Sequence, residues 1–94
     1  VADAAAASVM ADVTRTELHE RLLRIYYTEM GSRCSLTEVA KRVGTAVVMV
    51  REGLKPFVHH GLVRLTESRV EFRPPIEEET SARIRKWVLE HGLS

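Results

Sequence analysis

Cysteine is almost absent from the sequence, since Cys34 is alone among 94 residues. A single thiol cannot form a disulfide within the chain, which favours a reducing, intracellular setting and a cytoplasmic location. We expect Cys34 to be a small buried apolar residue in a short extended segment. No CxxC or HExxH pattern occurs, His59 and His60 are adjacent and so face different ways, and the other two histidines lack partners at ligand spacing. We therefore predict no metal site.

Long apolar runs are also missing. No stretch approaches the ~20 apolar residues that a bilayer-spanning helix needs, so we predict no membrane partner. The alanine-rich start has neither a basic region nor a strongly apolar centre, and it is not predicted to be a signal peptide. There is no glycine-rich phosphate loop and no recognisable arrangement of Ser, His and Asp. The sequence thus predicts neither an enzyme nor a bound cofactor.

The remaining composition is that of one small globular domain, with 45% hydrophobic and 29% charged residues. The formal net charge is only +1, but it is unevenly distributed. Residues 33–73 hold eight Lys or Arg and four Glu, a balance of +4, whereas residues 1–32 carry −2 and residues 74–94 carry −1. A local excess of positive charge has the sign expected for a surface that binds nucleic acid.

Two helices separated by a tight turn are predicted in the middle of the chain. Ser35 and Glu38 have the spacing of a capping box, which starts a helix after Ser35. Gly44 is the natural break, because glycine takes the left-handed cap conformation without strain. The second segment, residues 46–60, ends at Gly61 and has an apolar face at helical spacing made of Val50, Leu54, Phe57 and Val58.

A short β-hairpin is predicted next. Residues 63–65 and 70–72 alternate like two strands around the polar turn 66–69. We expect Leu65, Val70 and Phe72 to face the core. The order is therefore helix, turn, helix, hairpin.

This stretch resembles a winged helix-turn-helix domain. The resemblance is carried by residues 39–44, then Val50, Leu54, Phe57 and the triplet 61–63. It implies a mostly α (small α+β) fold with a short antiparallel wing at about residues 62–73, a C-terminal helix at about residues 76–91 and an N-terminal helix. We place a single domain at residues 14–94 and an alanine-rich helical extension at residues 1–13. Most members of the family bind DNA, and a substantial minority bind protein.

The flanking helices are predicted from their apolar stripes. A helix is expected to begin or restart after Thr14 and to end at Gly31; one continuous helix from Asp3 to Met30 is the alternative. The C-terminal helix follows two prolines, and its apolar face is Ile76, Ile84, Trp87, Val88 and His91. The predicted core comprises Leu22, Ile25, Val39, Val43, Val50, Leu54, Phe57, Leu62 and Leu65.

The second helix of the motif would be the recognition helix of the resembled family. Candidate contacts with double-stranded DNA are Thr45, Arg51 and Lys55 there, and Arg64, Arg69 and Arg73 on the wing. The start of this helix departs from the family pattern, because Val47, Val48 and Met49 cannot make the hydrogen bonds that read bases. Pro56 predicts a kink near residues 52–55 or a split into two short helices.

The sequence leaves two functions open. The first is a DNA-binding module, such as a transcriptional regulator or its DNA-binding domain. The alternative is a protein-interaction or oligomerisation module whose surface would comprise Val47, Val48, Met49, Leu23, Tyr27 and Met30. A homodimer through the N-terminal and first helices is expected to cover the apolar surface made of Val9, Met10, Val13, Leu23, Tyr27 and Met30. The rival expectation is that residues 1–13 fold back over it within one chain.

Overall fold

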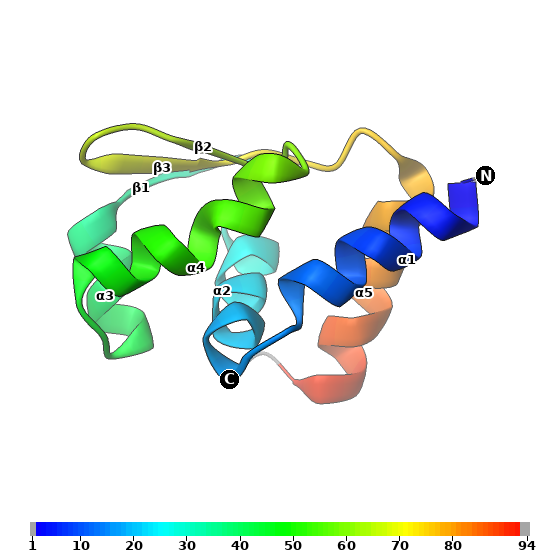
Figure 1. Ribbon diagram of the computed structural model, residues 1–94, viewed down its shortest axis with the longest axis horizontal. Helices are drawn as coiled ribbons and strands as arrows, with labels where there is room; N and C mark the ends of the chain where they lie inside the picture. Colours follow the sequence, from blue (N-terminus) through cyan, green and yellow to red (C-terminus); the bar gives the residue numbers. More distant parts are fainter. Residues whose placement is uncertain (1, 93–94) are drawn as a thin grey trace.

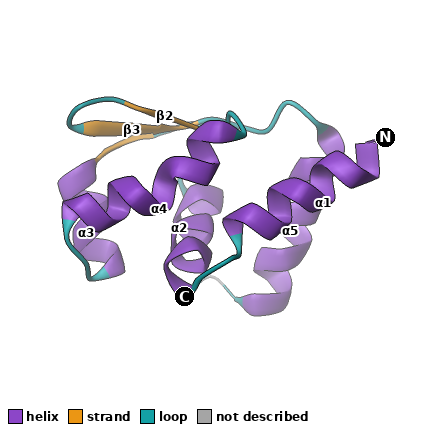
Figure 2. Cartoon of the chain, in the orientation of Figure 1, coloured by secondary structure: helices purple, strands orange, loops and turns teal. Residues whose placement is uncertain are grey.

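Helices and short strands follow one another in the order α, α, β, α, α, β, β, α. The computed structural model describes residues 2–92, and the side chains of residues 5–92. Within that range lie α1 (Ala2–Val13), α2 (Glu17–Thr28), β1 (Arg33–Ser35), α3 (Leu36–Val43), α4 (Val47–His59), β2 (Val63–Leu65), β3 (Arg69–Phe72) and α5 (Glu78–His91). The described chain is thus mostly helical with one small sheet (Figures 1 and 2). This confirms the predicted small α+β class.

The predicted helix, turn and helix occupy the middle of the chain. The Ser35 hydroxyl accepts a hydrogen bond of 3.1 Å from the Glu38 amide and caps the start of α3. Gly44 ends α3 in the left-handed region, at φ 83° and ψ 37°, and its amide donates to the Ala40 carbonyl over 2.8 Å. The chain therefore turns within residues 44–46 and enters α4, which packs directly against α3.

The sheet has one strand more than the predicted hairpin. β3 lies in the centre and pairs antiparallel with β2 on one side and β1 on the other. The extended segment expected around Cys34 is β1, whose residue Arg33 lies opposite Glu71. The sheet lies along one side of the helices, with its hairpin turn beside the start of α4 (Figure 1).

A single apolar core lies between the sheet and the helices. Eight of the nine predicted core residues are buried, and Leu65 is only half-buried because it ends the edge strand β2. Val70 and Phe72 point from β3 into this core, as expected. Tyr26 of α2 packs its ring against Phe57 and Phe72, and its hydroxyl donates to the Arg73 carbonyl over 2.5 Å. Burial raises the pKa of the Tyr26 hydroxyl, which therefore stays a hydrogen-bond donor.

The two N-terminal helices differ from the prediction in their boundary. Thr16, and not Thr14, caps α2, and its hydroxyl accepts from the His19 amide over 3.2 Å. The Thr14 hydroxyl instead donates to the Met10 carbonyl at the end of α1, over 2.6 Å. The alternative of one continuous helix is wrong, because residues 14–16 leave the helix and let the chain change direction.

Pro56 does not split the second helix of the motif. The structure has one helix, α4, from Val47 to His59 with Pro56 inside it, so the predicted division into two helices is wrong. Proline costs a helix interior about 3 kcal/mol. Leu54 and Phe57, on either side of it, are fully buried, and each contributes about 1.5–3 kcal/mol by leaving water. Pro56 has no amide hydrogen to donate to the Glu52 carbonyl, four residues earlier. Because Glu52 is exposed, water can bond to this carbonyl instead.

The C-terminal helix begins two residues later than predicted. α5 starts at Glu78, and Ile76 lies before it with 96% of its surface exposed. Including Ile76 in the apolar face was therefore wrong. Ile84 and Val88 are buried as expected, and Trp87 is half-buried with its ring stacked on the exposed His91 ring at 4.2 Å.

α1 folds back over the rest of the chain. It packs chiefly against α5, with further contacts to α4 and α2, and the two helices lie side by side in Figure 1. Val13 and Leu23 are fully buried, while Val9, Met10, Tyr27 and Met30 are partly buried against the core. Leu23 is thus a core residue, and its assignment to an interaction surface is wrong. The apolar surface that suggested a homodimer is largely covered within one chain.

Candidate nucleic-acid interface

The exposed start of α4 is apolar. Val48 and Met49 expose 63% and 48% of their surface, whereas Val47 is half-buried against the core. Thr45 lies in the turn before this helix, half-buried, with its amide donating to the Ala40 carbonyl over 3.0 Å. The first turn of α4 therefore offers van der Waals contact, and the Thr45 side chain lies just before it.

Arg51 and Lys55 follow on α4, and both side chains are already engaged. The Arg51 guanidinium donates to the Glu67 carbonyl in the turn between β2 and β3, which ties the helix to the end of the hairpin. The Lys55 ammonium forms an ion pair of 2.6 Å with Glu52 one turn earlier on the same helix. An exposed pair of this kind is worth about 1 kcal/mol or less, so Lys55 is easily released to another anion.

The outer face of the sheet carries a group of three arginines. Along β3, Val70 and Phe72 are buried, so the alternating residues Arg69 and Glu71 point away from the helices. Arg64 of β2 lies opposite Glu71 on one side, and Arg33 of β1 lies opposite it on the other. Together with Thr66 these side chains line a shallow depression of about 210 Å³. Arg64 and Arg69, both predicted on the wing, thus line the same depression.

Arg73 lies apart from this group. It follows β3 at the base of the hairpin, where its amide donates to the Leu62 carbonyl over 2.8 Å. Four residues of extended chain separate it from Arg69, which is about 13 Å at the rise of a β-strand. Its side chain is exposed, but it does not share the depression that Arg64 and Arg69 line.

Arg33 and Glu71 were not among the residues that the sequence singled out. Arg33 precedes the helix-turn-helix, and only the pairing of β1 with β3 brings it onto the same face as the hairpin arginines. Its guanidinium lies 3.7 Å from the Glu71 carboxylate, a loose and exposed ion pair. The alternation along residues 69–72 was visible in the sequence, and it was the only available signal that Glu71 faces outward.

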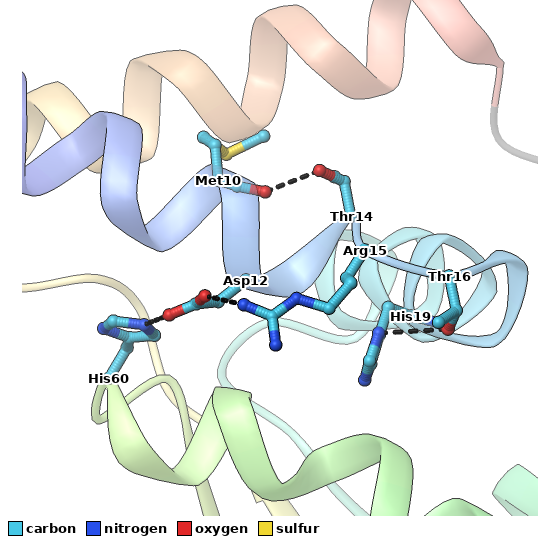
Figure 3. A network of polar contacts seen from close by, with 7 residues as sticks. All are labelled: Met10, Asp12, Thr14, Arg15, Thr16, His19 and His60. Atoms are coloured by element: carbon cyan, nitrogen blue, oxygen red, sulfur yellow. Dashed lines mark hydrogen bonds and ion pairs between the residues drawn. The ribbon is translucent and has the colours of Figure 1, made fainter.

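A second polar contact missed in the sequence joins α1 to the end of α4. His60 Nε2 lies 2.7 Å from an Asp12 carboxylate oxygen, and the other oxygen accepts from Arg15 over 2.7 Å (Figure 3). The hydrogen bond from His60, followed by the charges around it, lowers the pKa of the Asp12 carboxyl. His60 was considered in the sequence only as a poor metal ligand, and in the structure it holds α1 against the end of α4.

Cys34 shows no sign of an activated thiol. It is half-buried in β1, and burial together with the nearby Glu29 carboxylate raises the pKa of its thiol. A raised pKa lowers the fraction of nucleophilic thiolate. Cys34 therefore acts as a small packing residue, as expected, although it is not fully buried.

Comparisons with other proteins give no further assignment. No protein-family model, no curated protein and no solved structure matches the chain. None of the helices in residues 2–92 has the length and apolar character that crossing a bilayer requires.

Proposed function

We propose that the chain is a winged-helix module that binds double-stranded DNA, such as a transcriptional regulator or the DNA-binding domain of one. The order of α3, a tight turn, α4 and the β2–β3 hairpin supports this, because a winged helix-turn-helix has these elements in this order. In this proposal α4 is the recognition helix and residues 62–73 are the wing.

The observation that carries the proposal is the arginine group on the outer face of the sheet. Arg51, in the first half of α4, links this helix to the turn of the hairpin. Phosphate contacts supply most of the affinity of a protein for DNA of any sequence, and arginine binds phosphate oxygens in pairs. Val48 and Met49 add apolar contact but carry no donor for base edges, so the proposed binding is led by phosphates, with limited base reading.

The direct test is a titration with a labelled random-sequence duplex, followed by fluorescence anisotropy at 50 and 200 mM salt. We expect the association constant to fall steeply as salt rises. The plot of log K against log salt should have a negative slope whose magnitude is about 0.9 for each neutralised phosphate. Absence of binding at 50 mM salt would contradict DNA binding.

The residues on α4 give a graded test of the same proposal. Replacing Arg51 and Lys55 together with alanine should weaken binding and reduce the salt slope by about one unit for each phosphate that is no longer neutralised. Arg51→Ala also removes the tie to the Glu67 carbonyl, so its effect on folding is checked by urea unfolding. Unchanged affinity in a folded double variant would remove this face of α4 from the interface.

A protein-interaction module is the second candidate, and the exposure of Val48 and Met49 favours it. Such a module would use the apolar start of α4 against a partner protein and would not need the sheet arginines. Val48→Ser and Met49→Gln separate the two proposals. If the wild type binds DNA and the double variant binds it equally well, the result supports binding led by phosphate contacts. If the wild type binds no DNA, the protein-interaction module is the better account.

A further inference from the structure

Three arginines surround one carboxylate on the outer face of the sheet. Arg33 and Arg64 flank Glu71 across the strands, and Arg69 lies two residues before it on β3. Neighbouring strands lie about 4.8 Å apart, so Arg33 and Arg64 start about 10 Å from each other with Glu71 between them. Three exposed arginines thus extend from positions around a single, half-buried carboxylate.

Positive charge that is free to bind a ligand is concentrated on this face by three neighbouring arginines. Among the described residues, Arg64 and Arg69 make no side-chain hydrogen bond or ion pair, and Arg33 has only its 3.7 Å contact with Glu71. Of the other basic residues of the same segment, three are engaged: Arg42 with Glu29 at 3.2 Å, Lys55 with Glu52, and Arg51 with the Glu67 carbonyl. Lys41 and Arg73 are exposed, but neither lines the depression. Like charges held on paired strands repel one another, and an anion placed among them relieves that repulsion.

We propose that the outer face of the three-stranded sheet is the main phosphate-binding surface, in which Arg33 acts with Arg64 and Arg69 while Glu71 weakens the binding. This inference rests on the proposed function and deepens it. It assigns a DNA contact to β1, a strand outside both the helix-turn-helix and the hairpin. It also makes Glu71 a residue that limits affinity, because its carboxylate competes with phosphate for Arg33 and repels the DNA backbone.

The geometry suits a phosphodiester backbone. A guanidinium presents two parallel N–H groups to two phosphate oxygens, and strands fix the origin of each side chain better than a loop would. The depression lined by Arg33, Arg64 and Arg69 lets a phosphate approach more than one of them. Thr66 also lines it, and its hydroxyl donates to the Arg69 carbonyl over 3.1 Å and accepts from the Arg69 amide over 3.2 Å, which fixes the backbone from which Arg69 extends.

The first test compares Arg33→Ala with Arg85→Ala by anisotropy with the random duplex. Both variants remove one positive charge, but Arg85 lies on α5, which packs against α1 and α2 away from the sheet. Arg33→Ala should weaken binding about tenfold at 50–100 mM salt and lower the salt slope by about 0.9, as expected when one phosphate is no longer neutralised. Arg85→Ala should change affinity by less than about twofold. Equal effects of the two variants would overturn the inference.

The second test uses a gain of affinity, which a misfolded variant cannot mimic. Glu71→Gln keeps the shape of the side chain and removes its charge. Binding should tighten about threefold at ionic strength below 0.1 M, the Coulomb effect of one charge about 7 Å from a phosphate in water. Unchanged or weaker binding by Glu71→Gln would contradict the role assigned to Glu71.

The two tests also separate this inference from the proposed function. Suppose that the wild type binds duplex DNA with a steep salt dependence and that Arg33→Ala and Glu71→Gln behave like the wild type. The proposal of DNA binding then stands, and the assignment of phosphate binding to the outer face of the sheet is wrong. If the wild type binds no duplex at 50 mM salt, both are wrong.

Discussion

At the scale of single residues, the contact between Asp12 and His60 shows how a few polar atoms hold α1 against α4. Asp12 lies one residue before the end of α1, and His60 caps the end of α4. The two side chains are 28% and 15% exposed, and Arg15 adds a second donor to the carboxylate. Val9, Met10 and Val13 of α1 pack on the core through apolar side chains, whereas the contact between Asp12 and His60 contains groups that titrate and so responds to pH.

The Asp12 contact predicts a specific dependence of stability on acid. Because folding lowers the pKa of Asp12, its contribution is complete above the ordinary aspartate pKa of about 3.9 and disappears as the pH falls through the lowered value. Asp12→Asn should therefore reduce the free energy of unfolding at pH 7 and flatten the fall in stability below pH 4. Urea unfolding between pH 2 and 7 measures both effects.

Glu90→Gln is the matched control, since Glu90 is an exposed carboxylate on α5. Glu90→Gln should leave the fall in stability below pH 4 unchanged. If Asp12→Asn leaves the fall in stability below pH 4 the same as in the wild type, the contact between Asp12 and His60 does not contribute to stability in solution.

Sequence patterns at this scale identified caps but not long-range partners. Ser35 and Gly44 were predictable because each acts on a helix end within a few residues of itself. Asp12 and His60 are 48 residues apart, and Arg33 reaches Glu71 only through strand pairing. No local rule contains such contacts, which depend on how the whole chain folds.

At the scale of elements, α4 approaches α2 unusually closely at Gly53. A Cβ atom built on Gly53 would lie 2.7 Å from a Leu22 methyl carbon and 3.0 Å from one of Leu18. Leu22 is fully buried and has no free space to move into. Gly53 is therefore the position that allows α4 and α2 to touch.

Gly53→Ala should destabilise the protein even though alanine is the better helix former. Helix propensity favours the change by about 1 kcal/mol, whereas overpacking a filled core costs about 1–3 kcal/mol. We expect a net decrease of up to about 2 kcal/mol in the free energy of urea unfolding. Val48→Ala, at an exposed site of the same helix, should be neutral or slightly stabilising. A Gly53→Ala protein more stable than wild type would show that the helices can move apart without cost.

Element boundaries show why the order of elements was easier to predict than their ends. Apolar spacing predicted every helix and both hairpin strands, because periodicity extends over many residues. The start of α2 was placed at the wrong threonine, since Thr14 and Thr16 have similar local sequence and only the packing of α1 decides between them. Pro56 was given too much weight because its neighbours Leu54 and Phe57 are held by the core.

At the scale of the whole molecule, α1 closes the apolar surface of one chain. Leu23 makes this point most clearly, because it was expected at an interface and is fully buried instead. Leu23→Ala should lower the free energy of unfolding by about 2–5 kcal/mol, the usual cost of a cavity left by leucine. Urea unfolding at 1 and 100 µM protein should give the same decrease, because the contact lies within one chain.

Leu89→Ala is the control for this prediction, since Leu89 on α5 is 73% exposed. It should change stability by less than about 0.5 kcal/mol. An unfolding midpoint that rises with protein concentration in the wild type, and no longer does so in Leu23→Ala, would instead place Leu23 in a dimer.

The charge pattern has its meaning at this scale too. A net charge of +1 hides an excess of +4 in residues 33–73, and folding gathers part of that excess on the outer face of the sheet. α1 and α5 pack together on another part of the molecule (Figure 1). A DNA duplex bound as proposed would contact the sheet and α4 and leave α1 and α5 free.

Amide chemical shifts measured during titration with a short random-sequence duplex at 50 mM salt test this central claim most directly. The account predicts the largest changes in residues 33–35, 44–55 and 63–72, and little change in α1 and α5. Raising the salt to 200 mM should reverse them, because the contacts are to phosphate. Changes centred on α1 and α5, or no changes at saturating duplex, would contradict the account.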